Sequence, residues 1–306
     1  MRIQQLKYII KIVETGSMNE ASKHLFVTQP SLSNAVRELE EEMNIKIFTR
    51  STRGITLTSD GVEFLSYARQ IVEQTELLEE RYKYNREKKE LFAVSAQHYA
   101  FVVESFASIL RENDMRNYEL ILRETRTHEV IDDVRDFRSE IGVLYLNDFN
   151  RDVLTKLFLD NNLEFTPLFQ AVPHVFISKH HPLANKTSVT LDEMAEFPYL
   201  SYEQGERNSF YFSEEILSTA RHDKSIVVSD RATLFNLLIG LDGYTISTGI
   251  LNSDLNGDDI FSVPLQVDEK IEIGYICHKK GLLTELGQRF LKELKGTSNN
   301  YQLIHL

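Results

Sequence analysis

Polar side chains repeat at helical spacing between residues 29 and 37. Gln29, Ser33 and Arg37 lie four residues apart, and Pro30 and Asn34 lie beside them, so a helix would present all five on one side. Amide, hydroxyl and guanidinium groups on such a face can hydrogen-bond base edges in the major groove of DNA. Arg37 can equally contact a phosphate. The alternative is a solvated helix face, which is what a polar stripe usually is.

Three short helices are predicted in the first 43 residues. Apolar residues at positions 6, 9, 10 and 13 form an amphipathic stripe, which Gly16 would end. Ser17, followed by Glu20 three residues later, is a capping box that begins a second helix. Thr28 is the expected N-cap of the third helix, which runs to about Met43. Two short helices joined by so tight a turn form a helix-turn-helix.

A hairpin is expected directly after the third helix. Residues 45–48 and 54–57 read as short strands on either side of a polar tip that holds Arg50 and Arg53. Guanidinium groups on such a tip suit phosphate oxygens. The helix-turn-helix spacing, the polar helix face and this wing together predict DNA binding.

The charge is distributed unevenly along the chain. The 306 residues carry a net charge of −12, but residues 1–58 hold 8 Lys/Arg against 6 Asp/Glu. A mildly basic head on an acidic body fits a nucleic-acid partner for the head alone. No run of about 20 apolar residues and no signal-peptide pattern occurs. The single cysteine, Cys277, excludes an internal disulfide and a multi-cysteine metal site. We therefore expect a cytoplasmic protein.

A long helix is predicted over residues 59–90. Its apolar positions recur with alternating spacings of four and three, which is typical of a coiled-coil seam. We expect this seam to pair with a second copy of the chain, and the alternative is a helix that packs on its own domain. The predicted dimer seam consists of Phe64, Ala68, Ile71, Thr75, Leu78 and Tyr82.

Strands and helices alternate from Leu91 onward. Strand-like runs at 91–95, 118–123 and 141–145 are separated by helical stretches, which is a βαβαβ pattern and predicts a parallel sheet. The expected fold class is therefore a chain with an α+β head and an α/β body.

The segment TGSMNEASKHLFVTQPSLSNAVRELEEEMNIKIFTRSTRGITLTSDG resembles the N-terminal domain of the LysR-type transcriptional regulators. A weaker resemblance extends through the rest of the chain, at residues 181–184 (His-Pro-Leu-Ala) and at a glycine turn around Gly240 and Gly243. The N-terminal positions that carry the resemblance are Ser17, Ala21, Leu25, Gln29, Pro30, Ser31, Ser33, Leu39, Glu40, Phe48, Arg50, Arg53, Leu57, Thr58 and Gly61.

The resemblance implies three parts: a winged helix-turn-helix over 1–58, a linker and dimerisation helix over 59–90, and an effector-binding domain over 91–306. The last would be a two-lobed, periplasmic-binding-protein-like α/β domain, with lobe I at about 91–161 and 266–296 and lobe II at about 162–265. The chain would cross between lobes near Asn161–Asn162 and near Leu265–Gln266. The implied DNA-binding residues are Thr28, Gln29, Pro30, Ser31, Ser33, Asn34, Arg37, Arg50 and Arg53.

A ligand would sit in the cleft between the lobes, at strand ends and helix N-termini, where unpaired N–H groups favour anions. We expect a small anionic or polar metabolite, with the alternative that His98 only hydrogen-bonds within its own lobe. The matching positions are Ser95, Gln97, His98, Tyr99, Arg126, Thr127, Ser201, Tyr202, Thr245 and Ser247.

No local signature predicts catalysis or a cofactor. The sequence contains no P-loop, G-x-G-x-x-G, G-x-S-x-G or H-E-x-x-H motif, and the adjacent pair His180–His181 is poorly spaced for one metal ion. Cys277 is expected to be a buried strand residue. We expect a regulator rather than an enzyme, with operator DNA, a metabolite, further copies of the chain and RNA polymerase as partners. The open alternatives are an enzyme or solute-binding body, and a body that senses redox state or a protein.

Overall fold

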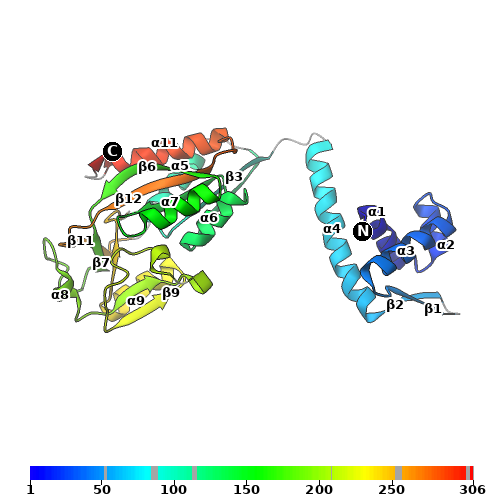
Figure 1. The fold of residues 1–306 in the computed structure, drawn as a ribbon, viewed down its shortest axis with the longest axis horizontal. Helices are drawn as coiled ribbons and strands as arrows, with labels where there is room; N and C mark the ends of the chain where they lie inside the picture. The colour runs from blue at the N-terminus through cyan, green and yellow to red at the C-terminus, as the bar shows by residue number, and fades with distance from the viewer. Residues whose placement is uncertain are drawn as a thin grey trace. The chain divides into compact units, whose positions relative to one another are not determined.

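The computed structural model describes residues 1–51, 54–83, 89–111, 116–207, 209–251, 257–300 and 304–305. The chain divides into two compact units, Met1–Lys88 and Lys89–Leu306 (Figure 1). Within the described residues, no helix is long and apolar enough to span a membrane.

The first unit is the predicted winged helix-turn-helix followed by a long helix. Ser17 and Thr28 cap the second and third helices, accepting hydrogen bonds from the N–H groups of Glu20 and Ser31. Apolar faces of the helices meet in one core that contains Leu6, Ile9, Leu32 and Leu39. The elements are α1 (Ile3–Thr15), α2 (Met18–His24), α3 (Gln29–Met43), β1 (Phe48–Ser51), β2 (Gly54–Leu57) and α4 (Ser59–Lys83).

Two of the predicted boundaries need correction. The helix α4 ends at Lys83, and Glu90, predicted to belong to the linker helix, is the first residue of β3 because it joins the parallel ladder opposite Tyr118. Residues 84–88 lie outside the described part of the chain.

The second unit contains two sheets, and the first has helices on both faces. The helices α5 and α11 cover one face of this six-stranded sheet, and α6 and α7 cover the other (Figure 1). Its order is β13-β6-β12-β5-β3-β4. The elements are β3 (Glu90–Ala96), α5 (Ala100–Arg111), β4 (Tyr118–Glu124), α6 (Thr127–Arg135), β5 (Ile141–Leu146), α7 (Arg151–Asp160), β6 (Leu163–Ala171), β12 (Ile271–His278), α11 (Glu285–Asn300) and β13 (Ile304–His305).

The second sheet has five strands in the order β11-β7-β10-β8-β9 and packs against α9. The predicted two-lobed α/β arrangement is thus confirmed. The elements are β7 (His174–Ser178), α8 (Leu191–Met194), β8 (Tyr199–Tyr202), η1 (Gly205–Arg207), η2 (Phe210–Phe212), β9 (Ser225–Val228), α9 (Arg231–Leu241), β10 (Tyr244–Ser247) and β11 (Ile260–Pro264).

The predicted first crossing between lobes, at Asn161–Asn162, is wrong. There the chain only turns, with Asn162 at a φ of 57°, and returns as β6 in the same sheet, antiparallel to β12. The chain leaves the first sheet after Ala171 and enters the second at His174. It returns between Pro264 and Ile271, where the second crossing was expected.

Candidate functional site

The helix α3 presents its polar side to solvent. Leu32, Val36 and Leu39 are buried on the opposite side, against the core of the first unit. Asn34 and Arg37 are exposed, and the Arg37 guanidinium lies 3.9 Å from the exposed carboxylate of Glu41. Thr28, Pro30 and Ser31 are exposed in the first turn, while Gln29 and Ser33 are half-buried. Seven predicted DNA-binding residues therefore lie on one helix and its cap.

A buried carboxylate, Glu40, fixes the wing to α3, a contact that no local sequence pattern predicts. Glu40 Oε1 accepts hydrogen bonds from the N–H groups of Ile47 at 2.8 Å and Phe48 at 3.1 Å, and Lys46 Nζ lies 3.2 Å from Oε2. Arg50 lies in β1, opposite Ile55 of β2. Arg53, the other predicted wing residue, lies outside the described residues.

The predicted dimer seam on α4 is partly buried within its own unit and partly exposed. Ala68 is buried in the core of its own unit, and Phe64 is half-buried and packs against that core. Ala68 and Phe64 belong to the stripe of α4 that packs against α1. This stripe also includes Leu65 and Val72. The remaining large apolar seam residues are exposed: Ile71, Leu78 and Tyr82.

Two of the predicted effector residues are internal supports. Ser95 is buried, donates a 2.6 Å hydrogen bond to Asp133 and lies 2.8 Å from the hydroxyl of Ser139. Gln97 is fully buried: its amide donates to Thr127 Oγ1 at 2.6 Å, and its carbonyl accepts from the Tyr99 hydroxyl and the Tyr145 N–H. Their polar atoms are satisfied within the first lobe, so the prediction that they bind a ligand is not supported by the geometry.

A segment of the second lobe covers the helix starts that were predicted to bind an anion. We call residues 203–215, without Asn208, the inter-lobe strap. The Thr127 N–H donates to Gln204 Oε1 at 3.3 Å, and the Thr127 hydroxyl donates to the carbonyl oxygen of Phe212 at 2.7 Å. Arg126 forms a close ion pair with Glu203. The start of α6 is therefore already occupied by oxygen atoms of the chain itself.

The carboxylate of Glu214 occupies the corresponding place just before α5. Its Oε2 accepts from the His98 N–H at 3.0 Å and lies 2.8 Å from His98 Nδ1. Burial alone would lower the pKa of His98, but the hydrogen bond and charge of Glu214 raise it above its usual value. The His98 ring also stacks on Tyr202, with centroids 4.0 Å apart. Because Glu214 belongs to the second lobe, the alternative that His98 hydrogen-bonds only within its own lobe is wrong.

The neighbouring carboxyl group, Glu215, is also buried. It accepts a 2.9 Å hydrogen bond from the Tyr202 N–H, and its backbone carbonyl accepts from the Tyr145 hydroxyl at 3.2 Å. Burial, together with the charge of Glu214, raises the pKa of Glu215 to about 8.

Little free space remains between the lobes. A cavity of about 30 Å³ is lined by His98, Tyr99, Tyr202, Thr245 and Ser247, among others. Ser201 does not line it and instead faces a separate cavity of about 490 Å³. Of the predicted effector residues, His98, Tyr99, Tyr202, Thr245 and Ser247 therefore line the cavity at the cleft, and Ser201 does not.

Two polar atoms beside this small cavity have no partner. The Thr245 hydroxyl is buried without a hydrogen bond among the described residues, and so is one guanidinium nitrogen of Arg231. The Nη2 atom of Arg231 donates to the Glu124 carboxylate of the first lobe at 3.2 Å, so Arg231 connects the two lobes. Buried polar atoms in folded proteins are normally paired, so these two atoms are unusual. Arg231 and Glu214 were missed from the sequence because their partners lie more than 100 residues away.

Metal binding has no support in the described part of the chain, where no group of three or more His, Cys, Asp or Glu side chains could hold an ion. Cys277 is half-buried, and burial raises the pKa of its thiol to about 12.

Two protein families match the chain. Residues 3–62 match the family described as bacterial regulatory helix-turn-helix protein, lysR family. Residues 113–298 match the LysR substrate binding domain.

Individual relatives extend the match over most of the chain. The uncharacterised HTH-type transcriptional regulator YbhD of Escherichia coli (strain K12) is 23% identical over 296 residues, covering 94% of this chain and 89% of that protein. The HTH-type transcriptional regulator AlsR of Bacillus subtilis (strain 168) is 25% identical over 257 residues, covering 82% and 78%.

Two solved structures share the fold at 18% sequence identity and a TM-score of 0.52. Full-length CbnR complexed with its target DNA covers 97% of this chain and is itself covered completely. A Corynebacterium glutamicum OxyR C206 mutant covers 98% of this chain, and 94% of it is covered.

Proposed function

Because this chain belongs to the LysR family of bacterial helix-turn-helix transcriptional regulators, we propose that α3 reads its operator and that a carboxylate metabolite bound between the lobes controls it. The exposed seam residues of α4 hold two copies together, as a dimer or within a dimer of dimers. The protein acts in the bacterial cytoplasm, with RNA polymerase as a further partner, and releases its ligand chemically unchanged.

The observation that carries the effector proposal is the position of the Glu214 carboxylate. It accepts from the N–H group and faces the ring nitrogen of His98, at the helix start where an anion is favoured. The chain thus places one of its own carboxylates at this helix start. A metabolite carboxylate is the group that can take this place, and its remaining atoms then reach toward the unpaired Thr245 hydroxyl and Arg231 nitrogen.

The size of the cleft requires Glu214 to move when the ligand enters. A space of about 30 Å³ holds no more than about one water molecule. Displacing Glu214 also disturbs its neighbour in the strap, Gln204, whose amide donates to Glu214 at 3.3 Å. A ligand shifts the lobes only by its differential affinity for the two arrangements. The ligand carboxylate must displace the carboxylate of Glu214, and this competition gives the ligand different affinities for the two arrangements.

The effector proposal is tested with paired acids and amides on the full-length protein. Benzoate and succinate, each compared with its amide, are titrated by calorimetry and thermal shift. We expect at least one acid to bind and its amide to fail. Glu214→Gln should strengthen acid binding about tenfold, because a neutral amide is a weaker acceptor for His98 than a carboxylate. Thr245→Val should weaken it.

The matched control is Glu206→Gln, which removes a charge from an exposed position of the same strap. It should leave acid binding unchanged. Equal binding of acid and amide, or an unchanged affinity in Glu214→Gln, would contradict the proposed competition.

The DNA-binding proposal predicts a change of base preference in Gln29→Ala. Loss of a bidentate side-chain contact to one base costs about 1–3 kcal/mol at the specific site and little at non-specific DNA. A gel-shift titration with the operator and with scrambled DNA measures both. Gln70→Ala, on the exposed surface of α4, is the control. An equal loss of affinity for both DNAs would show that Gln29 does not read a base.

A further inference from the structure

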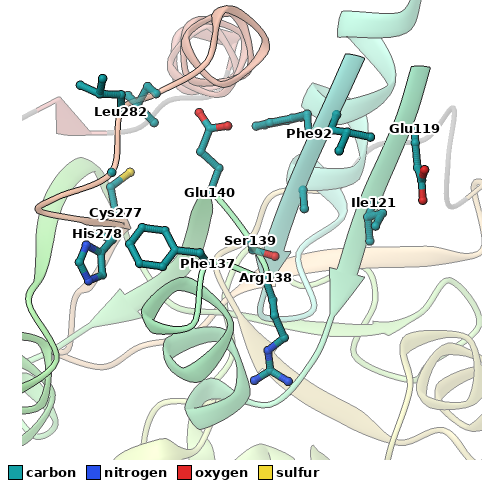
Figure 2. Close-up of a pocket in the computed structure, with 14 residues that line it drawn as sticks. Phe92, Glu119, Ile121, Phe137, Arg138, Ser139, Glu140, Cys277, His278 and Leu282 are labelled. Atoms are coloured by element: carbon teal, nitrogen blue, oxygen red, sulfur yellow. The ribbon is translucent and has the colours of Figure 1, made fainter. Parts of the chain in front are cut away.

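We propose that the first lobe holds a second ligand site, for a small uncharged apolar molecule, at the N-terminal edge of its sheet. A cavity of about 490 Å³ opens there between the starts of β3 and β4, the turn after α6 and the segment after β12 (Figure 2). This volume lies within the range of small-molecule pockets. We call it the edge cavity. None of the residues assigned above to DNA or to the inter-lobe cleft lines it.

The edge cavity exists because one helix is too short to cover the strands beneath it. The nine residues of α6 extend about 14 Å at ~1.5 Å per residue, whereas the seven residues of β3 or β4 extend about 23 Å at ~3.3 Å per residue. Among the described residues, the register pairs Leu91–Glu119 and Ala93–Ile121 are exposed or half-buried and form the floor. An uncovered apolar sheet face is a favourable surface for an apolar ligand.

Apolar side chains stand around the mouth of the edge cavity. Leu282 is 94% exposed and Phe137 64%, and the Phe137 ring lies against His278 with centroids 4.3 Å apart (Figure 2). Phe137 directly follows the C-cap of α6 and has a φ of 57°, the left-handed conformation that closes the helix, with its N–H bonded to the carbonyl of Val134. A ligand in the cavity would cover this exposed apolar surface.

The charges around the edge cavity disfavour an anion. Two carboxylates line it: Glu119, which forms an ion pair with Lys89 at 2.7 Å, and Glu140. Glu140 accepts hydrogen bonds from the N–H and hydroxyl of Thr284, and no ion pair with a described basic residue accompanies them. The one guanidinium, from Arg138, is held by Asp133 at 3.0 Å and Asp136 at 3.5 Å. The occupant therefore differs in charge from the carboxylate expected between the lobes.

The test uses two fluorescent probes with one aromatic skeleton. N-phenyl-1-naphthylamine is uncharged, and 8-anilinonaphthalene-1-sulfonate carries an added sulfonate. Each is titrated against the full-length protein. We expect the uncharged probe to bind about tenfold or more tightly than the sulfonate, since only the sulfonate brings an anion beside Glu119 and Glu140.

Two further measurements localise the probe. Ala93→Leu fills the floor and should weaken binding of the uncharged probe about tenfold, whereas Ala195→Leu, which adds equal bulk at an exposed site of the second lobe, should not. Cys277 is the single cysteine and lines the edge cavity. Its alkylation by N-ethylmaleimide, followed by intact mass, should slow several-fold when the uncharged probe is bound and stay unchanged with the sulfonate.

The proposal is overturned if the uncharged probe fails to bind, if Ala93→Leu binds it normally, or if Cys277 is not protected. It is also overturned if binding weakens as the protein concentration rises, because a second copy would then fill the edge cavity. Should Ala93→Leu fail to fold by circular dichroism, Leu282→Ser replaces it. This change removes an exposed wall residue, and unchanged binding would again contradict the site.

Discussion

Glu214 and Glu215 are adjacent in the chain, but their carboxyl groups lie in different environments. Glu214 faces His98 and forms an inter-lobe ion pair, whereas Glu215 is buried beside aromatic residues with a backbone N–H as its donor. Burying a carboxylate without a cation favours its neutral form. Glu215 therefore keeps its proton to a higher pH than an exposed glutamate does.

The raised pKa of Glu215 predicts a pH-dependent stability. Between the ordinary value near 4.5 and the native value of about 8, the folded chain holds a proton that the unfolded chain has lost. Stability must then fall as the pH rises through this range. Glu215→Gln keeps the acceptor for the Tyr202 N–H and removes the titration, so its melting temperature should exceed that of the wild type at pH 8 and match it near pH 5.

Calorimetric melting curves from pH 5 to 8.5 measure this difference. His98 titrates in both proteins, so the comparison isolates Glu215. Glu206→Gln is the control, because that side chain is exposed and should show the same difference from wild type at every pH. If the melting temperature of Glu215→Gln also differed from that of the wild type by the same amount at every pH, Glu215 would be ionised in the native state.

At the scale of elements, α4 uses two adjacent sides for two purposes. Leu65 and Val72 are buried against the first unit, while Ile71, next to Val72, is 39% exposed, and Leu78 is 59% exposed further along. A helix that packs one stripe on its own core and leaves a second apolar stripe uncovered is suited to self-association.

Ile71→Asp is expected to break the dimer without unfolding the first unit. The exposed side chain makes the change tolerable in a monomer, but in a dimer it places an unpaired charge in the interface, which is strongly unfavourable. Sedimentation velocity should show monomers, and operator binding should lose the avidity of two linked heads. Gln70→Asp adds the same charge outside the seam and should remain dimeric. If Ile71→Asp kept the oligomeric state of the wild type, the α4 seam would be excluded as the dimer interface.

The elements were largely predictable because their signals are local. Thr28 caps α3 through Ser31, three residues away, and the helix ends at Met43 as expected. The strand β6 was assigned to the wrong lobe because its partner β12 begins about 100 residues later, and no local pattern specifies that pairing. The same limit applies to the site. Gln97 was identified as polar at a helix start, but only the folded chain shows that Thr127, Tyr99 and Tyr145 satisfy it.

At the scale of the whole molecule, the second lobe is an insertion into the first. Ala171 and Ile271 are paired in the first sheet although they lie about 100 residues apart, and His174 and Pro264 are paired in the second. Both ends of the inserted lobe therefore emerge side by side, next to two neighbouring antiparallel strands.

Because of this insertion, folding of the second lobe lowers the entropy cost of folding the first lobe. Placing β12 beside β6 closes a loop of about 100 residues, for which the length-dependent cost is about 4 kcal/mol. Once β7 and β11 have paired, the effective loop shrinks to about 10 residues and the cost to about 2 kcal/mol. A substitution that unfolds the second lobe therefore costs the first about 2 kcal/mol in loop-closure entropy alone, in addition to the inter-lobe contacts that are lost.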